Sequence, residues 1–219
     1  MSSRTWSVGT ARLMADKEAA SVVVRLMIAL NDLAMANEGL GEWTATQERR
    51  KLARQNGGRL YYGRMLMAHV YEALSIIEDI QDSPKLRILV DACDPATRSS
   101  FNGVAVFLKT ADYGMLCRIR NNASFHYNGK LAVRAVEQIN KKFPEHVSTY
   151  SLGHHPLDWY FELGDLALDR IVVRDIFKAP ESADLRAAIN PILMRMHTMA
   201  GAFSDFAGHF IRNQLKRRQ

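Results

Sequence analysis

The chain has 219 residues, 47% hydrophobic and 24% charged, which is ordinary for a globular protein and argues against a disordered or low-complexity chain. A formal charge of +6 and a pI of about 9.4 favour an anionic partner such as nucleic acid. Cys93 and Cys117 lack zinc-like spacing and the first residues resemble no signal peptide, so we expect a cytoplasmic protein. No apolar run approaches the roughly 20 residues that span a bilayer, so no membrane segment is expected.

Apolar residues at helical spacing predict two helices in the first 82 residues. The first is expected to end at residues 38–41, which include two glycines. Its inner stripe is Val22, Leu26, Ala29, Leu33 and Ala36. The second is predicted from residues 44–46 to Asp82, with a break or kink at Gly57 and Gly58, because glycine costs about 1 kcal/mol in a helix interior. Its inner stripe includes Leu60, Met67, Val70, Leu74 and Ile77.

Two Xaa-Pro pairs mark the next helix starts, because Ser and Asp are good N-caps and proline fits the first turn. Ser83-Pro84 predicts a short helix to about residue 93, and Asp94-Pro95 predicts a helix to about residue 110. A further helix begins at Asp112, and Asn128-Gly129 closes or interrupts it. The next apolar stripe, stopped by a proline at 144, is predicted to be Ala132, Val136, Ile139 and Phe143.

The last third of the chain begins with its least regular part. Residues 144–160 predict a long loop with room for a short strand, residues 165–177 fit either a helix or a strand, and residues 178–183 predict a loop. A long helix that starts at Asn190-Pro191 then carries a narrow apolar seam, suited to core packing or to a dimer interface. The seam is Ile192, Met196, Met199, Phe203, Phe206 and Phe210.

These segments predict a mainly α protein, an antiparallel helix bundle with additional N- and C-terminal helices. The expected organisation is an N-terminal helix over residues 1–44, a helical core over 45–145, and a loop with C-terminal helices over 146–219, packed on the same domain.

The stretch "RIRNNASFHYN", residues 118–128, concentrates groups that bind phosphate and move protons. In one straight α-helix its buried stripe would be Leu116, Ile119 and Ala123. Arg120 and His126 would then differ by about 120° around the axis and ~9 Å along it. A single straight helix therefore cannot place both groups in one active site. Either the helix starts or bends within the stretch, or a second copy of the chain supplies the partner group.

These residue types suit RNA cleavage, because RNA carries its own nucleophile, the 2′-hydroxyl. Histidine titrates near neutral pH and acts as a base or an acid. Arginine stays charged and contacts phosphate at two points, and such preorganised charge is usually the largest catalytic contribution. Cleavage of this kind requires no metal.

The segment "RNNASFH", Arg120 to His126, resembles the R-x(4–6)-H motif of HEPN domains, with a polar residue, Asn121, directly after the arginine. The flanks "LCRIRNN" and "FHYN" also resemble HEPN helices, and the resemblance covers about residues 45–145. It implies a four- or five-helix bundle in which two copies form one composite site. It also implies a metal-independent endoribonuclease of a toxin–antitoxin, phage-defence or CRISPR-linked system, or a relative that only binds RNA, nucleotides or proteins.

The resemblance implies a phosphate-binding role for Arg120, a base or acid role for His126, and an orienting role for Asn121. Secondary candidates for substrate binding are Arg118, Asn122 and Tyr127. The expected partners are RNA, a second copy of the chain, and an antitoxin or regulatory protein, with no cofactor and no metal. The alternative is a solvated polar face or an interhelical hydrogen-bond network without catalysis.

Two other constellations remain open. Arg64, His69 and Glu72 on one long helix fit either a paired histidine near the core or a second basic group beside an RNA cleft. Histidines in a loop can bind zinc, which would suit a metal-dependent hydrolase, but their spacing matches no zinc motif. These loop residues are His146, His154, His155 and Asp158.

Overall fold

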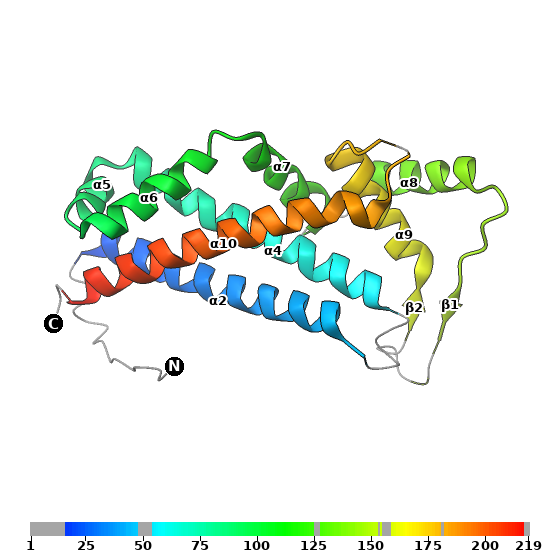
Figure 1. Cartoon of the computed structure of the whole chain (residues 1–219), viewed down its shortest axis with the longest axis horizontal. Helices are drawn as coiled ribbons and strands as arrows, with labels where there is room; N and C mark the ends of the chain where they lie inside the picture. The colour runs from blue at the N-terminus through cyan, green and yellow to red at the C-terminus, as the bar shows by residue number, and fades with distance from the viewer. Residues whose placement is uncertain are drawn as a thin grey trace. The chain divides into compact units, whose positions relative to one another are not determined.

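The protein is a mainly α-helical bundle, as predicted, with one two-stranded sheet among the described residues (Figure 1). The computed structural model describes residues 16–47, 54–124, 128–152, 154, 159–180 and 182–216. The α-helices are α2 (Lys17–Ala45), α4 (Gln55–Asp82), α5 (Pro84–Asp91), α6 (Pro95–Phe107), α7 (Ala111–Ile119), α8 (Gly129–Lys142), α9 (Glu162–Arg170) and α10 (Leu185–Lys216). Two segments are π-helical, η1 (Arg120–Ser124) and η3 (Ile171–Ile176), and the strands are β1 (Tyr150–Ser151) and β2 (Tyr160–Phe161).

The chain divides into two compact units. The first unit comprises Met1–Ala34, Glu72–Thr110 and Thr198–Gln219, and the second comprises Met35–Tyr71 and Ala111–His197. The long helices α2, α4 and α10 each contribute one segment to each unit. The predicted motif over residues 118–128 belongs to the second unit.

In the first unit, α2 and α4 are antiparallel neighbours joined by an ion pair of 2.7 Å between Arg25 and Asp79. Four of the six residues predicted for the α10 seam are buried, namely Met196, Phe203, Phe206 and Phe210. Phe206 packs edge-on against Phe101 of α6 with 5.2 Å between the ring centroids. Most apolar positions predicted for α2, α4 and α10 are buried. Amphipathic periodicity was therefore a sound guide to these long helices.

Both predicted N-caps of the first unit are confirmed. Ser83 Oγ accepts a hydrogen bond of 3.3 Å from the backbone N–H of Leu86, and Asp94 Oδ1 accepts one of 3.0 Å from that of Thr97. Each cap satisfies a backbone donor that the first helical turn leaves unpaired. The following proline costs nothing there, since its missing N–H would have had no helical partner.

Helix α2 is long and apolar enough, by length and composition alone, to cross a membrane. No apolar run of this length was expected from the sequence, because Arg25 and Asp32 interrupt the apolar segment. Core helices of globular proteins satisfy the same criterion, and α2 buries Val22, Leu26 and Leu33 inside the protein. The structure is thus compatible with a soluble protein.

In the second unit, close helix approach explains the glycines that were expected to end or break helices. Helix α2 does not stop at residues 38–41 but continues to Ala45, and a Cβ at Gly39 would overlap the ring of Tyr62 on α4. Helix α4 begins at Gln55, so the predicted start at residues 44–46 was wrong, and Gly57 and Gly58 lie in its first turn rather than in its middle. A Cβ on Gly58 would overlap the indole of Trp43. These glycines bring helices together rather than ending them.

Helices α4 and α10 run parallel in the second unit. Residue numbers rise together along the two helices, because Arg59 Nη2 lies 3.5 Å from Asn190 Oδ1 and a Cβ on Gly63 would lie 3.1 Å from Leu193 Cδ2. Helix α10 begins at Leu185, so the predicted start at Asn190-Pro191 was wrong and Pro191 lies inside the helix.

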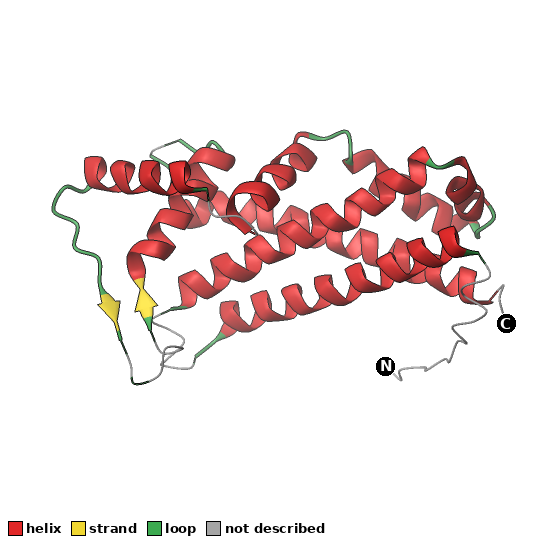
Figure 2. Cartoon of the chain, turned by 180° about the vertical axis from the view of Figure 1, so that it is seen from behind, coloured by secondary structure: helices red, strands yellow, loops and turns green. Residues whose placement is uncertain are grey.

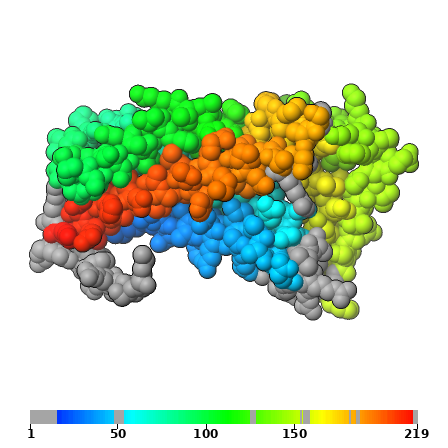
Figure 3. Space-filling model, viewed as in Figure 1, coloured from blue at the N-terminus to red at the C-terminus, as the bar shows by residue number. Residues whose placement is uncertain are grey.

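The apolar stripe predicted for α8 was wrong at Ala132, Val136 and Phe143, which are exposed, and right at Ile139, which is buried. Asn128 starts this helix as its N-cap, and Ala135 and Ile139 are buried, whereas Val136 and Phe143 are 40% and 49% exposed. The segment from α8 to β1 lies at the surface, in yellow-green in Figure 3. Four-residue spacing gave the right period for α8 but the wrong face, since periodicity does not say where the neighbouring element lies.

The short strand and the loop predicted in the last third are present. Strands β1 and β2 pair antiparallel and lie side by side (Figure 2), with Tyr150 opposite Phe161. Residues 165–177, which fitted a helix or a strand, are helical through α9 and η3. The described residues of 178–183 form a loop, in which Lys178 has a φ of 58°.

Candidate functional site

The predicted motif lies where an α-helix changes into a π-helical turn. Helix α7 ends at Ile119, and η1 takes over from Arg120 to Ser124. The predicted buried stripe of Leu116, Ile119 and Ala123 is confirmed, since all three are fully buried. A π-turn closes its hydrogen bonds from i to i+5 and often marks a functional site. The offset calculated for one straight α-helix therefore does not apply within the motif.

The guanidinium of Arg120 is held by the residue that follows it. Arg120 Nη1 donates a hydrogen bond of 3.0 Å to Asn121 Oδ1, and Asn121 Nδ2 lies 3.4 Å from Cys117 Sγ. Arg120 is partly exposed and Asn121 is exposed, so the pair is at the surface of the second unit. Asn121, which was predicted to orient a phosphate or the histidine, thus also contacts the arginine.

Asn122 and Arg118, the secondary candidates, lie together. Asn122 Nδ2 donates to the carbonyl of Arg118 over 2.9 Å, and Asn122 Oδ1 accepts from Asn128 Nδ2 over 3.4 Å. Asn128 also accepts from backbone N–H groups at the start of α8. Asn122 therefore links the motif turn to the next helix.

His126 and Tyr127, the remaining predicted site residues, lie outside the described residues. Their assigned roles stay predictions. Within the described part of the motif, Arg120 contacts Asn121, and Asn122 contacts the backbone of Arg118.

A buried arginine of α4 anchors the motif turn. The Arg64 guanidinium donates to the carbonyl of Ala123, and Ser124 Oγ donates to the carbonyl of Arg64 over 3.2 Å. Arg64 is 4% exposed and Ser124 is 7% exposed, so both links are made away from solvent. Burying a carbonyl without a hydrogen-bond donor costs free energy, and the Arg64 guanidinium supplies a charged donor to the carbonyl of Ala123. This contact gives Arg64 a structural role at the motif turn and does not decide between the two interpretations of Arg64, His69 and Glu72.

A cleft of about 480 Å³ opens beside Arg64 in the second unit. We call it the aromatic cleft, because six of its eleven lining residues are aromatic. It is lined by Trp43, Arg54, Gly57, Gly58, Tyr61, Tyr62, Arg64, Trp159, Tyr160, Phe161 and Asp165. Its volume falls within the roughly 300–1,000 Å³ typical of small-molecule sites.

Asp165 provides the carboxylate of the aromatic cleft. Burial raises the pKa of Asp165 above its ordinary value, against the hydrogen bond from Tyr160 and the charges of Arg54 and Arg64, which lower it. Burial likewise raises the pKa of Tyr160. The carboxylate packs against the backbone of Gly57, where a Cβ would overlap it. Gly57 thus makes the space in which this acid sits.

Both arginines of the aromatic cleft also lie near aromatic rings. The Arg54 guanidinium carbon lies 5.4 Å from the ring centroid of Tyr160, and that of Arg64 lies 5.8 Å from Tyr61. Such distances permit cation–π attraction. Because Arg64 also binds the carbonyl of Ala123, one side chain joins the cleft to the motif turn.

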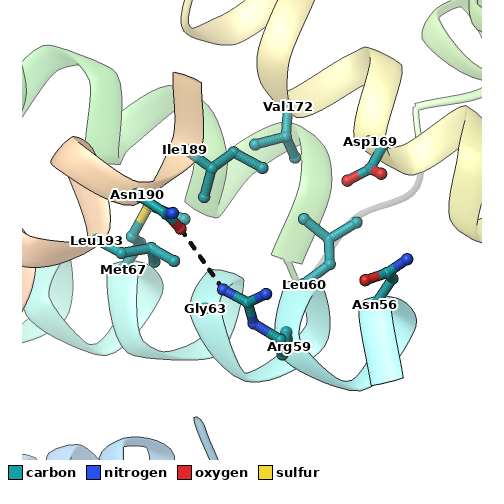
Figure 4. Close-up of a pocket in the computed structure, with 10 residues that line it drawn as sticks. All are labelled: Asn56, Arg59, Leu60, Gly63, Met67, Asp169, Val172, Ile189, Asn190 and Leu193. Atoms are coloured by element: carbon teal, nitrogen blue, oxygen red, sulfur yellow. Dashed lines mark hydrogen bonds between the residues drawn. The ribbon is translucent and has the colours of Figure 1, made fainter. Parts of the chain in front are cut away.

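A second cavity, shown in Figure 4, is too small for a substrate. Its volume is about 50 Å³, well below the roughly 300 Å³ at which small-molecule sites begin. Arg59 reaches across it to Asn190, while Asp169 and Asn56 lie on the other side of Leu60 (Figure 4). We read this cavity as a packing feature between α4, η3 and α10.

The described residues contain no group of three or more His, Cys, Asp or Glu side chains placed to hold a metal. In the histidine loop, His146 Nε2 lies 3.0 Å from Ser148 Oγ. His155 and Asp158 lie outside the described residues.

Comparisons with models of known families, with curated proteins and with solved structures found no match to this chain. Sequence reasoning missed the aromatic cleft. Its local signals were the pair Gly57-Gly58 and the aromatic run Trp159 to Phe161, about 100 positions apart. Only the fold brings them together.

Proposed function

We propose that this chain is a metal-independent endoribonuclease of the HEPN type. The observation that carries the proposal is the arrangement of Arg120: a partly exposed guanidinium, held 3.0 Å from Asn121 Oδ1, on a π-turn anchored to α4. An arginine that is preorganised in this way is suited to a scissile phosphate, because little reorganisation is needed when charge develops. The basic chain supports an anionic substrate.

In the proposed reaction, His126 takes the proton of the RNA 2′-hydroxyl, and the 2′-oxygen attacks the adjacent phosphorus. The bond from phosphorus to the 5′-oxygen breaks, and this oxygen receives a proton from an acid. The products are a 2′,3′-cyclic phosphate and a 5′-hydroxyl. Arg120 binds the phosphate oxygens and stabilises their growing charge, while Asn121 fixes the orientation of Arg120.

The direct test incubates RNA with purified wild type, Arg120→Ala and His126→Ala in EDTA. His209→Ala, at an exposed histidine of the first unit, serves as a matched control. We expect wild type and control to cut RNA and leave cyclic phosphate ends, which mass spectrometry detects, and both motif variants to lose activity. Equal cutting by all four proteins, or cutting by none, would refute catalysis by this motif.

A second copy of the chain is part of the proposal, and coexpression tests it. If Arg120 of one copy works with His126 of the other, a heterodimer of Arg120→Ala and His126→Ala chains retains one intact composite site. Tagged heterodimers should then regain about half of the wild-type activity. If each site instead uses both residues of one copy, the heterodimer stays inactive.

The alternative is an RNA-binding module without catalysis, using the same surface. It is favoured by the local hydrogen bonds of Asn121 and Asn122, which fit a structural role as well as a catalytic one. RNA binding that weakens steeply with salt, with no cleavage by wild type, is the result this alternative predicts.

A further inference from the structure

We propose that the aromatic cleft binds a guanine base of single-stranded RNA. The inference rests on the proposed function for its choice of RNA as the ligand. It goes further by naming a base and a second site, built from residues outside the motif.

The walls of the cleft suit a flat, aromatic ligand. Tyr61, Trp159 and Phe161 are 47%, 42% and 55% exposed, so each presents ring surface at the cleft. Proteins that recognise single-stranded RNA stack unpaired bases on such rings. Tyr62 has a different role, because its ring packs against Gly39.

The carboxylate selects among the bases. Guanine presents two neighbouring donors, N1–H and the 2-amino group, and the two oxygens of Asp165 can accept both. An ionised carboxylate only accepts hydrogen bonds, with about four lone-pair positions, so the bond from Tyr160 leaves capacity for a base. Adenine and cytosine place a ring-nitrogen acceptor beside their amino group, and uracil has one donor between two carbonyls. These three bases would set an acceptor against the carboxylate.

The arginines complement the acceptor edge of the same base. In the DNA major groove, arginine paired with guanine O6 and N7 is the commonest specific base contact, and the same two acceptors are present on a guanine base of RNA. Arg54 lies over the ring of Tyr160, and both Arg54 and Arg64 interact electrostatically with the Asp165 carboxylate. The cleft therefore holds donors and acceptors of the two kinds that guanine requires, around one half-buried acid.

Arg64 relates this base site to the motif. Arg64 lines the cleft, and its guanidinium donates to the carbonyl of Ala123 within η1. A base in the cleft would thus lie about one arginine side chain from the motif turn. This arrangement predicts cleavage beside guanosine, because the bound base would position the neighbouring phosphate near Arg120.

The experiment uses nucleosides, whose lack of phosphate separates base recognition from the motif. Guanosine, inosine, adenosine and cytidine are titrated into the full chain in EDTA, and quenching of tryptophan fluorescence is measured. Trp43 and Trp159 line the cleft and report on stacking. We expect guanosine to bind at least about tenfold more tightly than adenosine or cytidine, with inosine, which lacks the 2-amino group, in between.

Two variants test the contacts, and a third serves as a control. Asp165→Asn should remove the preference for guanosine over adenosine. Tyr61→Ala should weaken guanosine binding by roughly tenfold, within the range for loss of one base–aromatic stack. Phe143→Ala, at a 49% exposed aromatic residue that does not line the cleft, should bind as wild type does.

The outcomes separate this inference from the proposed function. Guanosine binding that responds to Asp165→Asn, in a protein that does not cut RNA, supports the cleft and overturns catalysis. RNA cleavage that requires Arg120, without any nucleoside preference or with a preference that survives Asp165→Asn, overturns the cleft as a guanine site. Circular dichroism of each variant confirms that it is folded.

Discussion

The described part of the second unit contains two π-helical segments, and they differ in almost every other respect. Segment η3, Ile171–Ile176, buries five of its six residues, four of them aliphatic. Segment η1, Arg120–Ser124, buries only Ala123 and Ser124 and leaves Arg120, Asn121 and Asn122 at least partly exposed. The same backbone irregularity therefore serves a core in one place and a polar surface in the other.

Both segments use an arginine to satisfy carbonyl groups, but the arginine comes from different places. Arg174, within η3 itself, donates to the carbonyls of Ala179 over 3.2 Å, Pro180, and Ala183 over 2.8 Å, which folds the following loop back onto the helix. Arg64, which anchors η1, comes from α4 and also lines the aromatic cleft. A π-turn alone therefore does not indicate a functional site. Segment η1 is the functional candidate because it has exposed polar groups and lies next to the aromatic cleft.

The largest expected effect separates activity from stability at η1. Arg120→Ala should lower the RNA cleavage rate by roughly 10²–10³-fold, the usual loss for one preorganised charge donor. The free energy of unfolding should change by less than about 0.5 kcal/mol, because Arg120 is at the surface. Single-turnover kinetics and urea unfolding measure the two quantities. A variant that unfolds much more easily, with its activity lost in proportion, would make Arg120 structural.

For the two arginines that satisfy carbonyls, Arg174 and Arg64, we expect substitution to affect stability first and activity second. Arg174→Ala should destabilise the protein by about 2–4 kcal/mol, since it leaves three carbonyls without this charged donor. Arg64→Ala should destabilise it similarly and, in protein that is still folded, should also reduce cleavage by displacing η1. Urea unfolding gives the midpoint of each variant. The cleavage rate, measured at urea concentrations well below that midpoint, then distinguishes the two arginines. Equal residual activity in both variants would remove the special role of Arg64.

A smaller effect tests the close packing around the aromatic cleft. Gly58→Ala should destabilise the protein by about 1–3 kcal/mol, because the added Cβ overlaps the indole of Trp43. Gly103→Ala is the matched control in α6, where a Cβ meets nothing within 4 Å, and it should stabilise by about 0.5–1 kcal/mol through helix propensity. Thermal unfolding measures both. The same sign for both changes would mean that the approach of α2 to α4 is looser than described.

The smallest effect concerns pH. Burial raises the pKa of Asp165, so its ionised form costs stability above that raised pKa, and the cost disappears as the pH falls below the ordinary value. Asp165→Asn should therefore raise Tm at pH 7 by up to ~3 °C, with the gain fading toward acid pH. Asp94 is the opposite case, since hydrogen bonds from Thr97 and Asn213 lower its pKa.

The contribution of Asp94 is present at neutral pH and is lost as the pH falls through its lowered pKa. Asp94→Ala should accordingly lower Tm at pH 7, with a deficit that shrinks in acid. Calorimetric scans of wild type and both variants between pH 3 and pH 7 give the two trends. Parallel curves for wild type and Asp165→Asn would contradict the raised pKa.

Local signals predicted the helices well because the forces behind them act within a few residues. A cap such as Ser83 or Asp94 needs only the next turn, and the seam of α10 needs only its own period. The errors came where a neighbour decides the outcome. Residues 38–41 allowed a helix end, yet α2 continues past them because α4 packs closely against Gly39.

The sequence by itself determined the mainly helical class, the two capped helix starts and the composition of the motif from Arg118 to Asn128, since each depends on near neighbours in the chain. Tertiary structure alone decided which face of α8 is buried, that α4 and α10 run parallel, and that Arg64 meets Ala123. It also decided that Asp165 meets Gly57, which forms the aromatic cleft. Contacts between residues 59 to 131 positions apart depend on how helices pack, and no local pattern encodes that.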